Sequence, residues 1–336
     1  AHELETETNG SRGFRQKLSK WLERKLIKHA DMTLVVSESI ADWYANEYKM
    51  PRPPVVLNAP NKRELETNNH FREQLNIRKD QIILLYQGGL AQGRGVHLIL
   101  DAFKARNDDK VVVVFMGYGE LEADIKNAAT EYDNIYFFPA VPPNIVLEYT
   151  SSADMGIHLI QNTCLNHDYC MPNKLFEYAM AGLPVLVSNM KDMSELVLNN
   201  NMGTVISDFS VNGINQAIDD FLVQDLTNMK ANAYRVACEN AWEIQEQKML
   251  AAYEEMFERG LMMNKTAHLT SVHPRYDTRI FLKECTSLAK ADYETHLVVA
   301  DGKGNEQKNN VHIHDVGASK GRFDRILNAP GRVLKK

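Results

Sequence analysis

The sequence has few cysteines and no long hydrophobic run, and each absence excludes a class of protein. Its cysteines, too few and too scattered for a disulfide framework, are Cys164, Cys170, Cys238 and Cys285. No apolar run approaches the ~20 residues that a membrane-spanning helix needs. The opening residues, AHELETETNG, form an acidic, loop-like start rather than a signal peptide. We therefore expect a cytoplasmic protein with reduced thiols.

Neither sign of charge dominates the chain. The 336 residues include 38 basic and 44 acidic ones, for a formal net charge of −6. This balance gives no argument for a nucleic-acid partner. The chain is 44% hydrophobic and 24% charged, as ordinary globular proteins are, and it is long enough to bury two hydrophobic cores.

Short apolar runs rich in β-branched residues alternate with amphipathic helical stretches along most of the chain. The runs occupy residues 31–37, 53–60, 81–89, 110–119, 134–141, 154–160, 183–189 and 203–208. Strands of this kind, separated by helices, are typical of a parallel sheet covered on both faces. The sequence therefore predicts an α/β fold. A long helical stretch ends the series, and a second strand–helix–strand pattern follows Met263.

A glycine-rich turn lies between the run at residues 81–89 and an amphipathic helix. The segment reads LYQGGLAQGRGVHLILDAF, and its glycines are Gly88, Gly89, Gly93 and Gly95. Exposed backbone amides, together with the cation of Arg94, would suit a pyrophosphate. The spacing does not match G-x-G-x-x-G, which disfavours a dinucleotide-dependent dehydrogenase. Plain turn geometry explains a single turn of this kind equally well.

Two further segments favour a nucleotide cleft. Gly117 and Gly119 form a similar turn after the next apolar run. In the segment DYCMPNKLFEYAMAGLPVLVS, residues 168–188, Lys174 and Glu177 lie three apart near the start of a helix. Such a pair is usually a solvated surface pair. At the carboxyl end of a parallel strand, however, the carboxylate can accept hydrogen bonds from ribose hydroxyls and the lysine can contact phosphate.

These three segments, in this order and spacing, resemble the nucleotide-binding domain of retaining GT-B glycosyltransferases that build bacterial surface polysaccharides such as O-antigen and capsule. The resemblance covers residues 80–210 closely. It implies two Rossmann-like domains facing a cleft, with residues 61–225 binding the nucleotide sugar and residues 226–260 forming a C-terminal helix region. It also implies that Arg94 contacts the donor diphosphate and that Glu177 holds the ribose.

The resemblance assigns a catalytic pair, Arg94 and Lys174, and a larger donor-binding set. That set is Gly88, Gly89, Gly93, Gly95, Gly117, Tyr169, Asn173, Glu177, Arg275, Asp277 and Arg279. Two positions depart from the family pattern, since Gly89 stands where the family commonly has arginine and Tyr169 where it has a glutamate that touches the donor sugar. No D-x-D pair lies at the predicted cleft, so we expect no metal and no cofactor besides the nucleotide-sugar substrate.

The two ends of the chain resemble two parts of the family's N-terminal domain. Residues 263–336 resemble its beginning, and residues 1–60 resemble its end. We therefore expect these ranges to form one acceptor-side domain, with the native start at Met262 or Met263 and the HPRYDTR loop facing the cleft. The order is rotated relative to the family, by a circular permutation or by a gap. We also expect a joining unit of roughly 30 residues or more between Lys336 and Ala1 in the family's arrangement.

The function implied by the resemblance is hexosyl transfer. The sugar would pass from a nucleotide sugar to a glycan or lipid-linked acceptor in bacterial surface-polysaccharide synthesis, with retention at the anomeric carbon. Two alternatives stay open. One is a sugar-nucleotide epimerase with the GT-B fold, which would need no acceptor. The other is an inactive protein that only binds nucleotide sugar.

The predicted helix at residues 12–28 is basic and amphipathic. Seven cations oppose one acid, Glu23. Its apolar face consists of Phe14, Leu18, Trp21, Leu22 and Leu26. Two interpretations fit: a packed helix with a solvated basic rim, or a peripheral contact with anionic lipid at the inner face of the membrane.

Two histidine- or cysteine-containing segments invite a metal-site interpretation. His312 and His314 alternate on a predicted strand, so both face one side, a pattern that favours satisfied strand histidines over a metal site. The segment CLNHDYC, residues 164–170, has no second Cys/His pair nearby. We therefore expect no zinc there.

Overall fold

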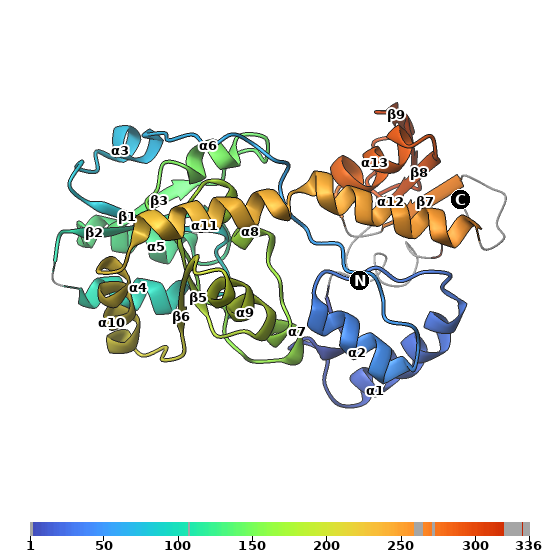
Figure 1. The fold of residues 1–336 in the computed structure, drawn as a ribbon, viewed down its shortest axis with the longest axis horizontal. Coiled ribbons are helices and arrows are strands. Elements are labelled where there is room, and N and C mark those ends of the chain that lie inside the picture. Colours follow the sequence, from blue (N-terminus) through green and yellow to red (C-terminus); the bar gives the residue numbers. More distant parts are fainter. Residues whose placement is uncertain (1–2, 107, 259–264, 271–272, 319–330, 332–336) are drawn as a thin grey trace. The chain divides into compact units, whose positions relative to one another are not determined.

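The computed structural model describes residues 3–106, 108–258, 265–270, 273–318 and 331 (Figure 1). The chain divides into two compact units, Ala1–Gln245 and Glu246–Lys336. The predicted native start at Met262 or Met263 and the ends at Ala1 and Lys336 lie outside the described residues.

The first unit contains a six-stranded parallel sheet with the order β3-β2-β1-β4-β5-β6. Its strands are β1 (Ile82–Gly89), β2 (Val111–Tyr118), β3 (Ile135–Pro139), β4 (Met155–His158), β5 (Val185–Ser188) and β6 (Gly203–Ile206). The chain winds outward from β1 to β3 and then returns to β4, so β1 and β4 flank a topological switch point. In open α/β sheets, ligands bind at the carboxyl ends of the strands on either side of such a point.

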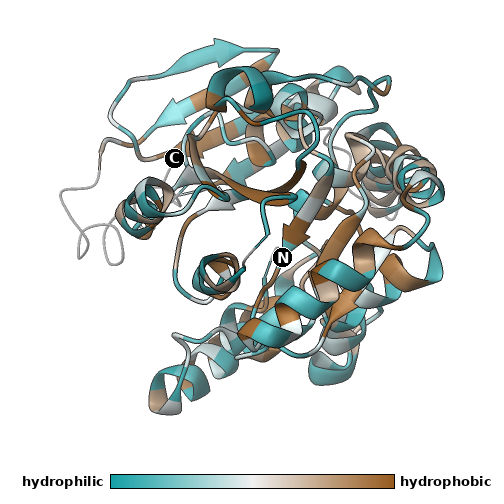
Figure 2. Ribbon diagram, turned by 90° about the vertical axis from the view of Figure 1, so that its left-hand side faces the viewer, coloured by the Kyte–Doolittle hydropathy of each residue, from teal (hydrophilic) through white to brown (hydrophobic). Residues whose placement is uncertain are grey.

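Helices cover both faces of this sheet, as the predicted buried strands require. They are α3 (His70–Leu75), α4 (Val96–Ala105), α5 (Glu122–Glu131), α6 (Val146–Thr150), α7 (Leu165–Asp168), α8 (Asn173–Met180), α9 (Lys191–Asn199), α10 (Val211–Leu222) and α11 (Leu226–Glu239). Figure 2 shows hydrophobic strands beneath helices that carry both polar and apolar residues. The helical stretch predicted to end the series is confirmed as α11 and α12 (Trp242–Glu258), and most of α12 belongs to the second unit.

Residues 3–60 add short helices to the first unit. These are η1 (Glu5–Glu7), α1 (Gly13–Leu26), η2 (Ile27–His29) and α2 (Glu38–Tyr48). The strands predicted at residues 31–37 and 53–60 shrink to a single parallel bridge between Val35 and Val55. Pro53 and Pro54 explain the difference, because neither has the N–H that a longer ladder would need.

The second unit contains a four-stranded sheet with the order β7-β8-β10-β9. Its strands are β7 (Lys265–Leu269), β8 (Glu294–Val299), β9 (Glu306–Lys308) and β10 (Val311–Asp315), and a π-helix (Ile280–Cys285) leads directly into α13 (Thr286–Lys290). The predicted strand–helix–strand pattern is thus confirmed here. The described strands of this sheet all come from residues 265–315, and the union of residues 263–336 with residues 1–60 in one domain stays a prediction.

His312 and His314 on β10 contact another histidine ring, as expected for strand histidines whose polar atoms have partners within the protein. His296 on β8 stacks between His312 and His314, with ring centroids 5.1 Å from each. A ring nitrogen of His296 lies 2.9 Å from one of His314. Among the described residues, no group of three or more His, Cys, Asp or Glu side chains is arranged to hold a metal ion.

Candidate functional site

The glycines at the switch point are required by close backbone contacts. A Cβ on Gly117 would lie 1.9 Å from the carbonyl oxygen of Gly88 on the neighbouring strand. A Cβ on Gly95 would lie 1.7 Å from the carbonyl oxygen of Leu159, just beyond β4. The backbone at the end of β1 and in the turn that follows therefore packs directly against the backbone at the carboxyl ends of β2 and β4. Any side chain larger than glycine would clash at these contacts.

The last two residues of β1 each lie beside a cationic side chain, and only Gly88 must be glycine to leave room for it. Gly88 has φ +117°, and a Cβ there would lie 2.1 Å from Cε of Lys174 on α8. At Gly89, the nearest atoms to a Cβ are Cδ and Nε of Arg94, each 4.0 Å away. The structure thus brings Arg94 and Lys174 together over the end of β1, as the sequence predicts.

These two cations form a site that favours an anion. Burial, and next the positive charge of Arg94, lower the pKa of Lys174 to about 8. Among the described residues, no carboxylate lies within ion-pair distance of Arg94 or Lys174, and the charge of Glu177 offsets the lowering of the Lys174 pKa only in part. Because two neighbouring positive charges disfavour each other, a bound phosphate or diphosphate would stabilise both.

A carboxylate lies beside the cations on the same helix. Glu177 accepts hydrogen bonds from Nε2 of Gln87 at 2.5 Å and from Nδ2 of Asn173 at 3.3 Å. Gln87 stands immediately before Gly88 on β1. The predicted residues Asn173 and Glu177 are therefore held at the end of β1, with Asn173 next to Lys174 in sequence and Glu177 about one helical turn after it.

His158 is a buried group at the end of β4 that sequence reasoning missed. Its side chain is 2% exposed, and Nδ1 has no hydrogen-bond partner. Burial lowers its pKa well below the usual value, and the charges of Lys174 and Arg94 lower it further. His158 is therefore a neutral imidazole, because burial and the two cations make a third positive charge there unfavourable.

A family comparison covers this whole arrangement. The model of the family described as glycosyl transferases group 1 matches residues 67–236, half of the chain. The chain belongs to this family. The match includes every residue of the anion site and its neighbouring carboxylate, from Gly88 to Glu177.

A curated relative agrees with the family assignment. The chain is 29% identical over 209 residues to a lipopolysaccharide 1,2-N-acetylglucosaminetransferase of Salmonella typhimurium (strain LT2), covering 56% of this chain and 53% of the relative. The chain thus spans about half the length of that curated protein.

Solved glycosyltransferase structures share the fold. WaaG, a glycosyltransferase involved in lipopolysaccharide biosynthesis, superposes with a TM-score of 0.51 at 20% identity, covering 68% of this chain and 66% of WaaG. HepE of Anabaena, solved in complex with UDP and glucose, superposes with a TM-score of 0.60 at 14% identity, covering 76% of this chain and 71% of HepE.

In this group 1 family member, Tyr169 contacts residues other than Arg94 and Lys174. It follows α7 and packs against the small core formed by residues 4–48. Its carbonyl oxygen accepts a hydrogen bond from Ser37 at 2.7 Å, and Nζ of Lys191 lies 5.5 Å from its ring centre. These contacts link Tyr169 to residues 3–60, and its predicted role in donor binding stays a prediction.

The three predicted donor-binding residues of the HPRYDTR loop belong to the second unit, where they support its fold. Arg275 is 4% exposed and donates to both carboxylate oxygens of Asp301, at 2.8 and 2.7 Å. Nε of Arg279 donates to Glu284 at 2.7 Å. The carboxylate of Asp277 accepts from the backbone amides of residues 279 and 280. Donor contact by these residues stays a prediction.

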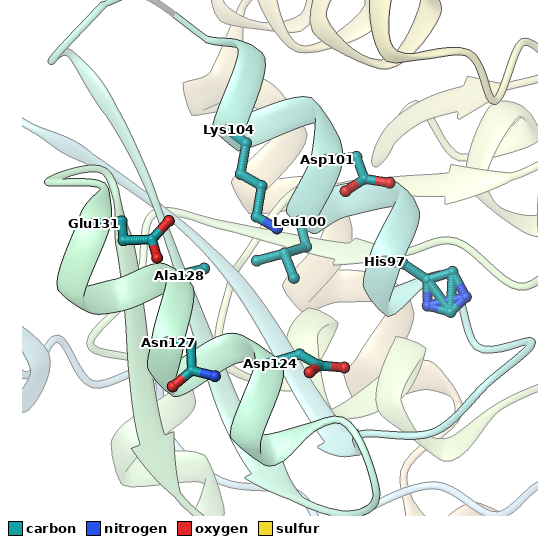
Figure 3. Close-up of a pocket in the computed structure, with 8 residues that line it drawn as sticks. All are labelled: His97, Leu100, Asp101, Lys104, Asp124, Asn127, Ala128 and Glu131. Atoms are coloured by element: carbon teal, nitrogen blue, oxygen red, sulfur yellow. The ribbon is translucent and has the colours of Figure 1, made fainter.

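A hollow of about 300 Å³ lies between α4 and α5, separate from the anion site (Figure 3). Its lining residues are His97, Leu100, Asp101, Lys104, Asp124, Asn127, Ala128 and Glu131. The lining mixes both signs of charge and shares no residue with the cluster around Arg94.

Proposed function

We propose that the protein is a hexosyltransferase that moves a sugar from a nucleotide-sugar donor to a glycan or lipid-linked acceptor in bacterial surface-polysaccharide synthesis, with retention at the anomeric carbon. The observation that carries this proposal is the pairing of Arg94 and Lys174 beside Glu177 at the topological switch point. That arrangement offers cations for a diphosphate and a carboxylate for a ribose. Family membership supports the proposal, and so does the lipopolysaccharide-synthesis relative.

The proposed transfer depends on stabilising the leaving diphosphate. The bond between the anomeric carbon and the diphosphate oxygen breaks, and its electron pair stays on that oxygen. A new bond forms between the anomeric carbon and an acceptor hydroxyl oxygen, whose proton passes to the departing diphosphate. Arg94 and Lys174 are positioned to neutralise the charge that grows on the diphosphate, and we propose that they do so without a bound metal.

A direct assay tests the proposed function. The protein is incubated with a panel of nucleotide sugars, with and without a lipid-linked glycan acceptor and with and without EDTA. We expect sugar transfer only when acceptor is present, and transfer that persists in EDTA. Donor turnover to an epimerised sugar nucleotide without acceptor would instead identify an epimerase. Nucleotide-sugar binding without any turnover would identify a binding protein.

Replacing the proposed ribose carboxylate should weaken nucleotide binding. Glu177→Gln removes the charge from a charge-assisted hydrogen bond, so we expect a loss of about 1–3 kcal/mol in nucleoside diphosphate binding. Calorimetry of both proteins measures the difference. Glu195→Gln, on the exposed side of α9, is the matched control and should bind like the wild type. Equal affinities for wild type and Glu177→Gln would remove Glu177 from the site.

We also propose that α1 contacts an anionic membrane surface. Large apolar side chains remain exposed on one face of this helix, including Phe14 (82%), Trp21 (56%) and Leu26 (67%). Cations flank this face in sequence, and among the described residues no helix is both long and apolar enough to cross a bilayer. An exposed apolar stripe with flanking cations fits peripheral binding at the inner face of the membrane, where a lipid-linked acceptor would be reached.

Vesicle binding tests the role of α1. Trp21→Glu should lower binding to phosphatidylglycerol vesicles by about tenfold, because it places a negative charge in the apolar stripe. Val223→Glu, which changes another exposed apolar residue (85%), is the matched control and should bind like the wild type. Co-sedimentation measures both. If Trp21→Glu and wild type bind equally, or if neither prefers anionic vesicles to phosphatidylcholine, α1 is a packed helix with a basic rim.

A further inference from the structure

We propose that Gln87 is a positioning residue, and that a relay from Thr150 through Gln87 fixes the Glu177 carboxylate for the ribose of the nucleotide. This inference rests on the proposed function and adds to it a residue that does not itself touch the donor. The relay joins three elements of the first unit. Thr150 ends α6, Gln87 lies on β1 and Glu177 lies on α8.

The relay is buried and its hydrogen bonds are short. Gln87 is 2% exposed and Thr150 is fully buried. The proton of the Thr150 hydroxyl has two acceptors within reach, Oε1 of Gln87 at 2.7 Å and the Val146 carbonyl oxygen at 2.8 Å, and Nε2 of Gln87 donates to Oε2 of Glu177 at 2.5 Å. The backbone amide of Gln87 also donates to the Tyr178 hydroxyl at 2.9 Å. Gln87 is thus held at its backbone and at both ends of its amide.

The charge of Glu177 sets the orientation of the Gln87 amide. A carboxylate only accepts hydrogen bonds, so the NH₂ group must face Glu177. A flipped amide would place two acceptor oxygens in contact. With the NH₂ facing Glu177, Oε1 faces Thr150, whose hydroxyl can donate to it. One arrangement therefore satisfies the side chains of Thr150, Gln87 and Glu177, and in it the Gln87 amide fixes the position of one Glu177 carboxylate oxygen.

A fixed carboxylate favours binding because it needs no ordering when the ligand arrives. Gln87 and Glu177 stand on a buried strand and on a helix packed against it, rather than on loops. Glu177 is also held at its other oxygen by Asn173. Support of this kind is what allows a functional carboxylate to meet two hydroxyls without losing side-chain entropy.

The first test compares ligands that contain ribose with one that does not. UDP, GDP, ADP and CDP are titrated into wild type by calorimetry, and the tightest binder is used with its nucleoside and with pyrophosphate. Gln87→Leu should lose about tenfold in affinity for nucleoside and nucleotide alike. Pyrophosphate binding should stay unchanged, because Arg94 and Lys174 are untouched. An equal loss for pyrophosphate would indicate general disruption and overturn the proposal.

The second test uses pH. Gln87→Glu places a second carboxylate against Glu177, and near pH 8 the two negative charges repel. As pH falls toward 5.5, the pair shares one proton, and the protonated group can donate to Glu177 as the amide does. The ratio of variant to wild-type affinity should therefore rise as pH falls. A ratio that stays constant with pH would contradict a positioning role.

Thr150 supplies matched variants. Thr150→Val removes the hydroxyl but keeps the shape, so it should weaken nucleoside binding, whereas Thr150→Ser keeps the hydroxyl and should bind like the wild type. Thermal unfolding of each variant confirms folding. If wild type binds none of the nucleotides, the proposed function itself fails. If wild type binds and Glu177→Gln weakens it, but Gln87→Leu and Thr150→Val do not, only the relay is overturned.

Discussion

Gly88→Ala is expected to lower the affinity for a nucleoside diphosphate by about 10–100-fold, the effect of losing one charge-assisted hydrogen bond. The added Cβ would lie 2.1 Å from Cε and 2.9 Å from Nζ of Lys174, so the lysine must leave its position over the end of β1. The residue also has φ +117°, a conformation in which a Cβ is strained, and this adds about 1–3 kcal/mol of destabilisation. Calorimetry and thermal unfolding measure the two effects separately.

Gly89→Ala is the matched control for this variant. It changes the neighbouring glycine of the same strand, but its Cβ would meet no atom closer than 4.0 Å. Alanine at this position keeps the backbone amide through which Gly89 is predicted to contact the donor, so we expect near wild-type binding and stability. Equal losses in both glycine variants would show that the turn is simply sensitive to substitution. Unchanged binding in Gly88→Ala would show that Lys174 does not contact the diphosphate.

Arg94→Ala should reduce sugar transfer by about 100–1000-fold, the range found when one preorganised group that stabilises developing charge is removed. Binding of the free nucleoside should change little, because the proposed partner of Arg94 is the phosphate. Arg94→Lys should recover part of the activity, since it keeps the charge but loses the planar fork. Initial rates with a saturating donor measure transfer, and calorimetry measures nucleoside binding. Equal losses for nucleoside and diphosphate would contradict a phosphate contact.

The sequence pattern predicted the parallel sheet because buried parallel strands are continuous β-branched runs. β1 and β2 begin with such runs. The glycine turns could be located for a related reason, since close backbone contacts at a strand end require glycine in any fold. The roles of Arg94 and Glu177 were implied by the family resemblance. The strand-to-helix pattern placed Lys174 and Glu177 on a helix reached from the carboxyl end of a strand, which the structure shows as β4, α7 and then α8.

The supporting residues could not be predicted from the sequence. Gln87 and His158 are single polar residues in apolar strands, and a lone residue has no period or spacing that indicates a partner. Their roles depend on which strands are neighbours, and the pairing of β1 with β4 joins segments about 70 residues apart. The ion pairs of Arg275 could not be predicted for the same reason, because its carboxylate partners Asp301 and Glu306 lie far along the chain.

The most direct test of the central claim is a crystal structure of the protein with a bound nucleoside diphosphate. We predict electron density for the two phosphates between Arg94 and Lys174, and for the ribose hydroxyls against the carboxylate of Glu177. Density in the hollow between α4 and α5 (Figure 3), with the switch point empty, would contradict the assignment.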